Sequence, residues 1–185
     1  DILDGNSNIS INKLNNLCKI SFILLRDLIK NIRADNLDKA KENVGSLIGL
    51  GIGLTPSADD VLLGFIGAFI FFSNYLKKTK FFYLISEIIK YIKSIASSKT
   101  TLVSQTYLKK AAEGKLSEFL SGFIVSLLTS RSFREIKFHT NRILFIGSSS
   151  GKEIVLGVSL GLKLYLEILN LNRSSLENVY KKSTN

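Results

Sequence analysis

Apolar residues recur along most of this chain at the three- and four-residue spacing of helices that are apolar on one face. The first predicted helix runs from Ile11 to about Arg33, and Cys18 should pack in its apolar face. A second, shorter helix should begin after a cap at Asp35 or Asn36 and end at a glycine-rich stretch. The amino-terminal part is therefore predicted to be helical.

The rest of the chain continues in the same pattern. A long uncharged run predicts a buried central helix from Pro56 to about Tyr75. Further helices are predicted at 81–95, at 101–112 with Gly114 as a stop, at 116–128 and at 152–169, and a short exposed helix from Ser174. Residues 132–142 are a weaker helix candidate, and residues 143–146 fit either a strand or a helix. Strand-like alternation is almost absent. The sequence thus predicts an all-α bundle of about seven to nine helices.

Composition favours one domain over residues 1–185, with an extended lead-in at 1–10 and a tail at 173–185. A net charge of +10 has two interpretations, a binding surface for a polyanion or an ordinary solvated surface. Because the lysines are scattered along the chain, the second is favoured, and we expect neither nucleic acid nor membrane as the partner. The longest uncharged apolar run is shorter than the ~20 residues that cross a bilayer. A single cysteine excludes an internal disulfide and fits a cytoplasmic location.

Gly49, Gly51 and Gly53 alternate with apolar residues in the most distinctive stretch of the sequence. Thr55 is predicted to cap the following helix, and Pro56, the only proline, to open it. A glycine-rich turn before a capped helix leaves backbone N–H groups free, and the helix dipole favours an anion there. This stretch is therefore the first candidate binding site.

Asp59 and Asp60 follow directly and complicate that interpretation. Two adjacent carboxylates at an anion-binding helix start need a cation, a proton or a hydroxyl-rich ligand nearby; magnesium is one candidate. The alternative is structural, because acidic residues in a first turn stabilise a helix by about 0.3–1 kcal/mol each. Both interpretations predict that the pair lies near the glycine loop.

Residues 148–157 repeat the pattern of residues 55–64 without a gap. The identical pairs are Ser57 with Ser150, Leu63 with Leu156, and Gly64 with Gly157. If the two helices pack through their glycines, both helix starts face one pocket, and Lys152 supplies a cation beside the two aspartates. Chance similarity between two capped helices is the alternative.

Several familiar motifs do not fit. A dinucleotide fingerprint would need a third glycine where Leu54 stands. The run 147–152 is one residue short of a phosphate loop, and Glu153 occupies the position of the magnesium-binding hydroxyl. His139 is the only histidine and has no partner motif. Nucleotide-dependent chemistry is therefore not expected.

The run from Gly49 to Gly64, with its Gly-Leu-Thr-Pro-Ser-x-Asp-Asp core, resembles the signature of the AllH-like proteins. The later Ser150-Gly151-x-Glu153-x-Val-Leu-Gly157 resembles the second glycine motif of that family. Thr100-Thr101-x-x-Ser104, followed by Ala111-Ala112-x-Gly114, resembles the segment between the two motifs. Members usually carry proline where this chain has Ile52 and glycine where it has Ala58, together with a further amino-terminal segment that we expect to be missing here.

The resemblance implies a subunit of an oxamate carbamoyltransferase that acts beside partner subunits or as a homo-oligomer. It implies a small anionic substrate, namely phosphate, a carboxylate or a carbamoyl compound; the alternative is a non-catalytic anion-binding or assembly module. The candidate catalytic residues are Asp59 and Asp60, and the candidate substrate-binding residues are Gly51, Gly53, Thr55, Ser57, Thr101, Ser104, Ser148, Ser149, Ser150, Gly151 and Lys152.

Overall fold

The computed structural model describes residues 16–76 and 80–183, with side chains described for 16–73 and 80–170. This part of the chain holds eight α-helices and no strand, which confirms the all-α prediction. The helices are α1 (Asn16–Arg33), α2 (Leu37–Leu47), α3 (Ser57–Leu76), α4 (Lys80–Lys99), α5 (Leu102–Ala112), α6 (Glu118–Thr129), α7 (Phe133–Leu144) and α8 (Ser150–Ser183).

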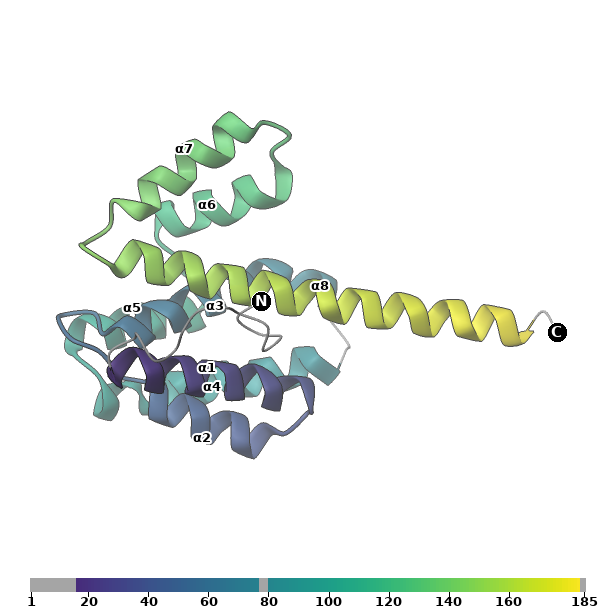
Figure 1. Cartoon of the computed structure of the whole chain (residues 1–185), viewed down its shortest axis with the longest axis horizontal. Coiled ribbons are helices and arrows are strands. Elements are labelled where there is room, and N and C mark those ends of the chain that lie inside the picture. The colour runs from purple at the N-terminus through teal and green to yellow at the C-terminus, as the bar shows by residue number, and fades with distance from the viewer. Residues whose placement is uncertain (1–15, 77–79, 184–185) are drawn as a thin grey trace.

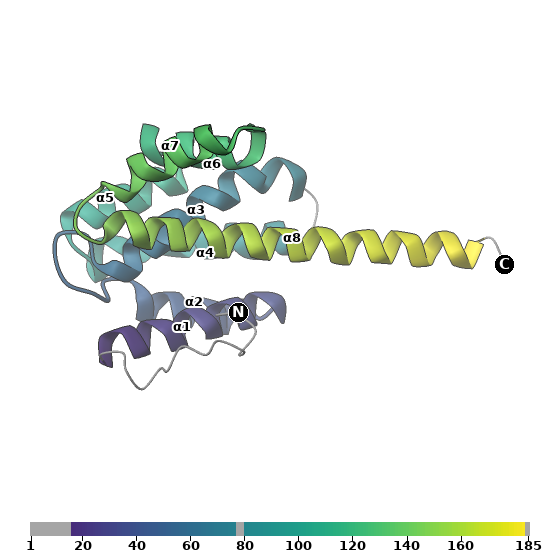
Figure 2. The same cartoon turned by 45° about the horizontal axis from the view of Figure 1, so that its top comes forward.

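The helices are arranged around α3 and α8, which cross at the centre of the bundle. The pair α1 and α2 lies on one side of α8, and the hairpin of α6 and α7 lies on the other (Figures 1 and 2). The carboxyl-terminal part of α8 extends beyond the other helices (Figure 1). Among the residues described, no helix has the length and apolar character needed to cross a membrane.

The crossing of α3 and α8 depends on glycine. A Cβ added at Gly64 would lie 2.1 Å from the carbonyl oxygen of Ile154, and one added at Gly157 would lie 1.9 Å from that of Val61. Real Cβ atoms do not approach backbone this closely, so the two helices are in direct backbone contact. The predicted packing of the two repeated segments through their glycines is confirmed.

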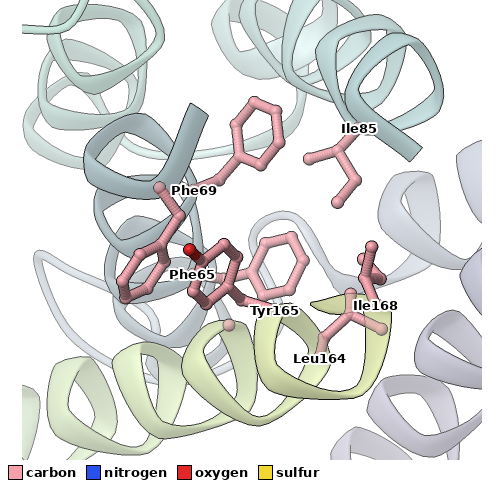
Figure 3. A pocket seen from close by; sticks show the side chains of 8 residues that line it. Phe65, Phe69, Ile85, Leu164, Tyr165 and Ile168 are labelled. Carbon is pink, nitrogen blue, oxygen red and sulfur yellow. The ribbon is translucent and has the colours of Figure 1, made fainter. Parts of the chain in front are cut away.

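Buried side chains of α3 belong to two apolar cores. One core lies between α3, α8 and the helices α1, α2, α4 and α5, and the other lies between α3, α8 and the α6–α7 hairpin. Figure 3 shows a small pocket in the first core, lined by Phe65 and Phe69 of α3, Ile85 of α4 and Tyr165 of α8. Its volume is about 10 Å³. An apolar space of this size holds at most one water, so the core is closely packed.

Several predicted details are corrected. Cys18 is exposed, because the buried residues of α1 all lie in its second half, at Leu28, Ile29 and Ile32. The break predicted after residue 169 is absent, since α8 continues through Ser183. Of the two alternatives left open for 143–146, the helix holds for residues 143 and 144, which end α7. The extended lead-in predicted at 1–10 lies outside the described residues, and so do residues 11–15 of the first predicted helix and residues 184 and 185 of the tail.

Candidate functional site

The amino-terminal ends of α3 and α8 meet, and this junction is the candidate site. The hydroxyl oxygens of Thr55 and Ser150 lie 3.0 Å apart and share a hydrogen bond. Thr55 was predicted as a helix cap, but α3 begins one residue after Pro56, at Ser57, and the hydroxyl of Thr55 bonds to α8 instead. The glycine crossing places the two starts together, because it fixes how far α8 slides along α3.

The glycine loop is folded against neighbouring backbone. Gly49 and Gly51 have φ of 82° and 141°, in the region that favours glycine. A Cβ at Gly49 would lie 2.2 Å from the carbonyl oxygen of Lys99, and one at Gly51 would lie 2.3 Å from the nitrogen of Ser57. Gly53 also has positive φ, at 101°, but has open space around its Cβ position. At least two of the three glycines therefore serve the fold of the loop.

Asp59 is 1% exposed and fully engaged by the protein. Its Oδ1 accepts a hydrogen bond of 2.8 Å from the N–H of Gly49, and its Oδ2 accepts one from the hydroxyl of Thr100. Asp59 thus ties the glycine loop and the α4–α5 turn to the first turn of α3. It does not line the pocket described below.

Thr101 and Ser104 hold the other side of the glycine loop. The hydroxyl of Thr101 accepts the N–H of Ser104 at 3.1 Å, which caps α5, and donates to the carbonyl of Leu54 at 2.5 Å. Ser104 is buried. Both residues therefore position Leu54 and the neighbouring Thr55.

Asp60 has a different environment from Asp59. Its carboxylate is 3% exposed, and its Oδ2 is buried without a hydrogen-bond partner among the described residues. Burial raises the pKa of Asp60 to about 6, and the hydroxyls of Ser150 and Thr55 offset only part of that rise. The negative charges of Glu153 and Asp59 raise the pKa further. A buried carboxylate with one oxygen left without a partner is costly to the fold and is typical of functional sites.

A pocket of about 510 Å³ lies over this carboxylate. Thr55, Asp60 and Ser150 line it together with residues of α5, α6 and the segment between them. Its walls are largely apolar, and the only charged residues among those that line it, besides Asp60, are Lys110 and Lys115. The apolar lining residues include Leu54, Leu63, Val103, Leu116, Phe119 and Ile154. A mostly apolar concavity with a few polar groups is the usual form of a small-molecule site.

The structure brings only some of the candidate residues together. Thr55, Asp60 and Ser150 line the pocket. The candidate residues that do not line it are Gly51, Gly53, Ser57, Asp59, Thr101, Ser104, Ser148, Ser149, Gly151 and Lys152. Lys152 is exposed, and the hydroxyl of Ser149 donates to Glu153 Oε2 at 3.3 Å. A Cβ at Gly151 would lie 2.0 Å from the carbonyl oxygen of Ile143, so this glycine packs α8 against α7.

Sequence reasoning missed Lys110 and Lys115. A signal for the first existed, because Val103, Tyr107 and Lys110 recur at helical spacing and all three line the pocket. Lys115 follows Gly114 in the turn between α5 and α6, where no periodicity applies. Its position depends on how α6 returns toward α3.

The two aspartates do not form an open magnesium site. Both oxygens of Asp59 already accept hydrogen bonds from the protein, which leaves Asp60 as the one carboxylate that faces the pocket. Among the side chains that the structure describes, at 16–73 and 80–170, no three acidic, histidine or cysteine side chains gather as metal ligands would. The donor set therefore fits an uncharged hydrogen-bond donor better than a divalent cation.

Comparison with known proteins identifies one family. A family model described as oxamate carbamoyltransferase subunit AllH matches residues 47–162, which is more than half of the chain. The matched range contains the glycine loop, both helix starts and both pocket lysines. No match is found among the curated proteins or among the solved structures.

Proposed function

Because the chain belongs to the AllH family, we propose that it works as a subunit of an oxamate carbamoyltransferase whose pocket over Asp60 binds the reacting amide. The observation that carries this proposal is the buried Oδ2 of Asp60, which lacks a partner. Oxamate and carbamoyl compounds both present an amide N–H₂ group, which donates to a carboxylate. Binding of such a group would give a partner to this carboxylate oxygen, which has none among the described residues.

In this proposal Asp60 also moves a proton. The amide nitrogen of oxamate attacks the carbamoyl carbon of carbamoyl phosphate, a C–N bond forms, and the C–O bond to phosphate breaks. The nitrogen loses one proton to Asp60, which passes it to the departing phosphate, so charge and atoms balance. A carboxylate with a pKa of about 6 is mostly ionised at neutral pH and can return the proton readily.

The hydroxyls of Thr55 and Ser150 would complete the amide site. They share a hydrogen bond with each other and lie beside Asp60, so either can donate to a substrate carbonyl oxygen. Two helix starts point toward the same space, and their dipoles favour the negative charge that develops there. These groups support the transfer without a metal ligand set.

An assembly role is the second candidate function. Ile52 and Leu54 at the tip of the glycine loop are 86% and 74% exposed, and Leu102 beside them is 76% exposed. Large exposed apolar side chains are typical of protein–protein contacts, and the family description names a subunit. We propose that partner subunits contact this loop and that the assembly is cytoplasmic, as the single cysteine suggests.

An Asp60→Asn variant, assayed with co-expressed partner subunits, separates the two functions. Catalysis by Asp60 predicts that turnover falls about 10²–10⁴-fold, as for loss of a general base, while the assembly still forms. Asp38→Asn is the matched control, because Asp38 also lies in a first helical turn but is exposed on α2. If Asp60→Asn turns over as fast as the unmodified chain, catalysis by Asp60 is ruled out and the assembly role is the one that remains.

A further inference from the structure

We propose that the pocket holds both reactants at once, with the amide of oxamate at Asp60 and the phosphoryl group of the second reactant at Lys110 and Lys115. This inference rests on the proposed function and adds a second subsite to it. The two subsites share one pocket but are built from different elements. Thr55, Asp60 and Ser150 come from the junction of α3 and α8, whereas the lysines come from the end of α5 and the turn after it.

The volume of the pocket supports two occupants. Oxamate has six non-hydrogen atoms and carbamoyl phosphate has eight. At the ~30 Å³ that each water takes in the liquid, fourteen such atoms occupy about 420 Å³. The pocket measures about 510 Å³, so both fit together and oxamate alone leaves most of the space to water. Water in that space would compete with the amide for the carbamoyl group.

The distribution of charge supports the same division. Lys110 lines the pocket, is exposed, and has no ion pair within the described residues. Lys115 is paired with Glu113, at 3.3 Å between Nζ and Oε2. A lysine ammonium without a counter-charge beside apolar walls suits an anionic group of the ligand. Phosphate, with its higher charge, gains more there than a carboxylate does.

The length of α5 keeps the two subsites apart. Thr101, at the start of α5, contacts the carbonyl of Leu54 next to Thr55. Lys110 lies nine residues further along the same helix, which is a rise of about 13 Å. The start of α5 therefore holds the loop beside Thr55, and the other end of the same helix carries Lys110, which gives the phosphoryl group a position separate from that of the amide.

Calorimetric titration of the full chain tests the two subsites. Phosphate is titrated at constant ionic strength, first alone and then with saturating oxamate. Two subsites predict that the Kd for phosphate stays the same or falls when oxamate is present. If the Kd for phosphate rises in proportion to the oxamate concentration, the two ligands compete for one subsite. That result overturns this inference but not the proposed function. Failure of both ligands to bind overturns both proposals.

Two lysine variants locate the phosphate subsite. Lys110→Gln should weaken phosphate binding about tenfold and leave oxamate binding unchanged. Lys109→Gln is the matched control, because it removes the same charge one residue away. The ammonium of Lys109 does not line the pocket and instead donates to Ser97 Oγ at 2.5 Å and Gln105 Oε1 at 3.2 Å. Equal losses in both variants would show a general charge effect and overturn the assignment.

Discussion

At the scale of single residues, Asp59 and Asp60 show how adjacent identical side chains acquire different roles. Successive residues of a helix point about 100° apart, because one turn takes 3.6 residues. Asp59 therefore faces Gly49 and Thr100, and both of its oxygens are paired. Asp60 faces the start of α8, where its Oδ2 stays unpaired. The first stabilises the loop, and the second is available to a ligand.

Asp60→Asn should stabilise the fold above pH 6. The pKa of Asp60 is about 6 when folded, above its ordinary value of 3.8, so ionisation is harder in the folded state. The free energy of unfolding therefore falls as pH rises from about 4 to 6, and the cost above pH 6 is about 2–3 kcal/mol. Asp60→Asn does not have this cost, because an amide does not ionise. Urea unfolding at pH 8 and pH 4 should show a gain at pH 8 that largely disappears at pH 4.

Asp59→Asn is the contrasting control for that measurement. The amide oxygen of the variant can still accept from Gly49, but its NH2 group then faces Thr100, whose hydroxyl must turn to accept, and both bonds lose the charge of the carboxylate. We expect a loss of about 1–3 kcal/mol at pH 8. A loss in Asp60→Asn of the same size would mean that its carboxylate is satisfied in the fold.

At the scale of elements, the crossing of α3 and α8 organises the site. Gly64 and Gly157 allow the helix backbones to touch, and this contact brings Thr55 within hydrogen-bonding distance of Ser150. The long helix α8 thus contributes to packing along its first half and to the pocket at Ser150 and Ile154. A change at the crossing should therefore alter stability and ligand binding together.

Gly157→Ala tests this coupling. The new Cβ would lie 1.9 Å from the carbonyl oxygen of Val61, and backbone cannot move aside as a side chain can. We expect a loss of about 1–3 kcal/mol in the free energy of unfolding and weaker oxamate binding. Gly45→Ala is the control, because its Cβ would meet only the hydroxyl of Tyr91, at 3.3 Å. That variant should gain up to about 1 kcal/mol from helix propensity; equal effects in both variants would contradict the role of the crossing.

At the scale of the whole molecule, the two apolar cores differ in size, and the helices around them differ in how many of their side chains are buried. Residues 58–62 and 64–69 of α3 are all buried between them. In α7, by contrast, only Ile143 is buried, and Phe133 and Phe138 are among its exposed apolar side chains. The α6–α7 hairpin therefore rests on the smaller core, and Phe119 and Leu120 of α6 belong to the pocket wall. Local opening of this hairpin would also open the site.

Hydrogen exchange should show this difference. Local opening needs less free energy where few apolar side chains are buried. We expect backbone amides of α7 to exchange at least about tenfold faster than those in the centre of α3, as measured by mass spectrometry on the full chain. Slower exchange across α6 on addition of oxamate and phosphate would agree with ligand binding at the pocket wall. Uniform exchange across α3 and α7 would contradict the division into two cores.

The sequence by itself determined the features that depend on near neighbours along the chain. Helical spacing located most of the helices, and the repeated glycines indicated the α3–α8 contact. Caps were expected at Asp35 or Asn36 and at Thr100 or Thr101, and the second residue of each pair is the cap. Periodicity and capping are short-range effects, so they can be recognised in a few consecutive residues. The family resemblance likewise rested on a contiguous motif.

Only the tertiary structure decided which of these residues share a surface. It paired Asp59 and left Asp60 unpaired, exposed Cys18, and brought Lys110 and Lys115 rather than Lys152 to the pocket. Each outcome depends on how α5, α6 and α8 pack against α3, that is, on contacts between residues tens of positions apart. Helical spacing places Val103, Tyr107 and Lys110 on one face of α5, but which element packs opposite that face is set by residues far away in the sequence.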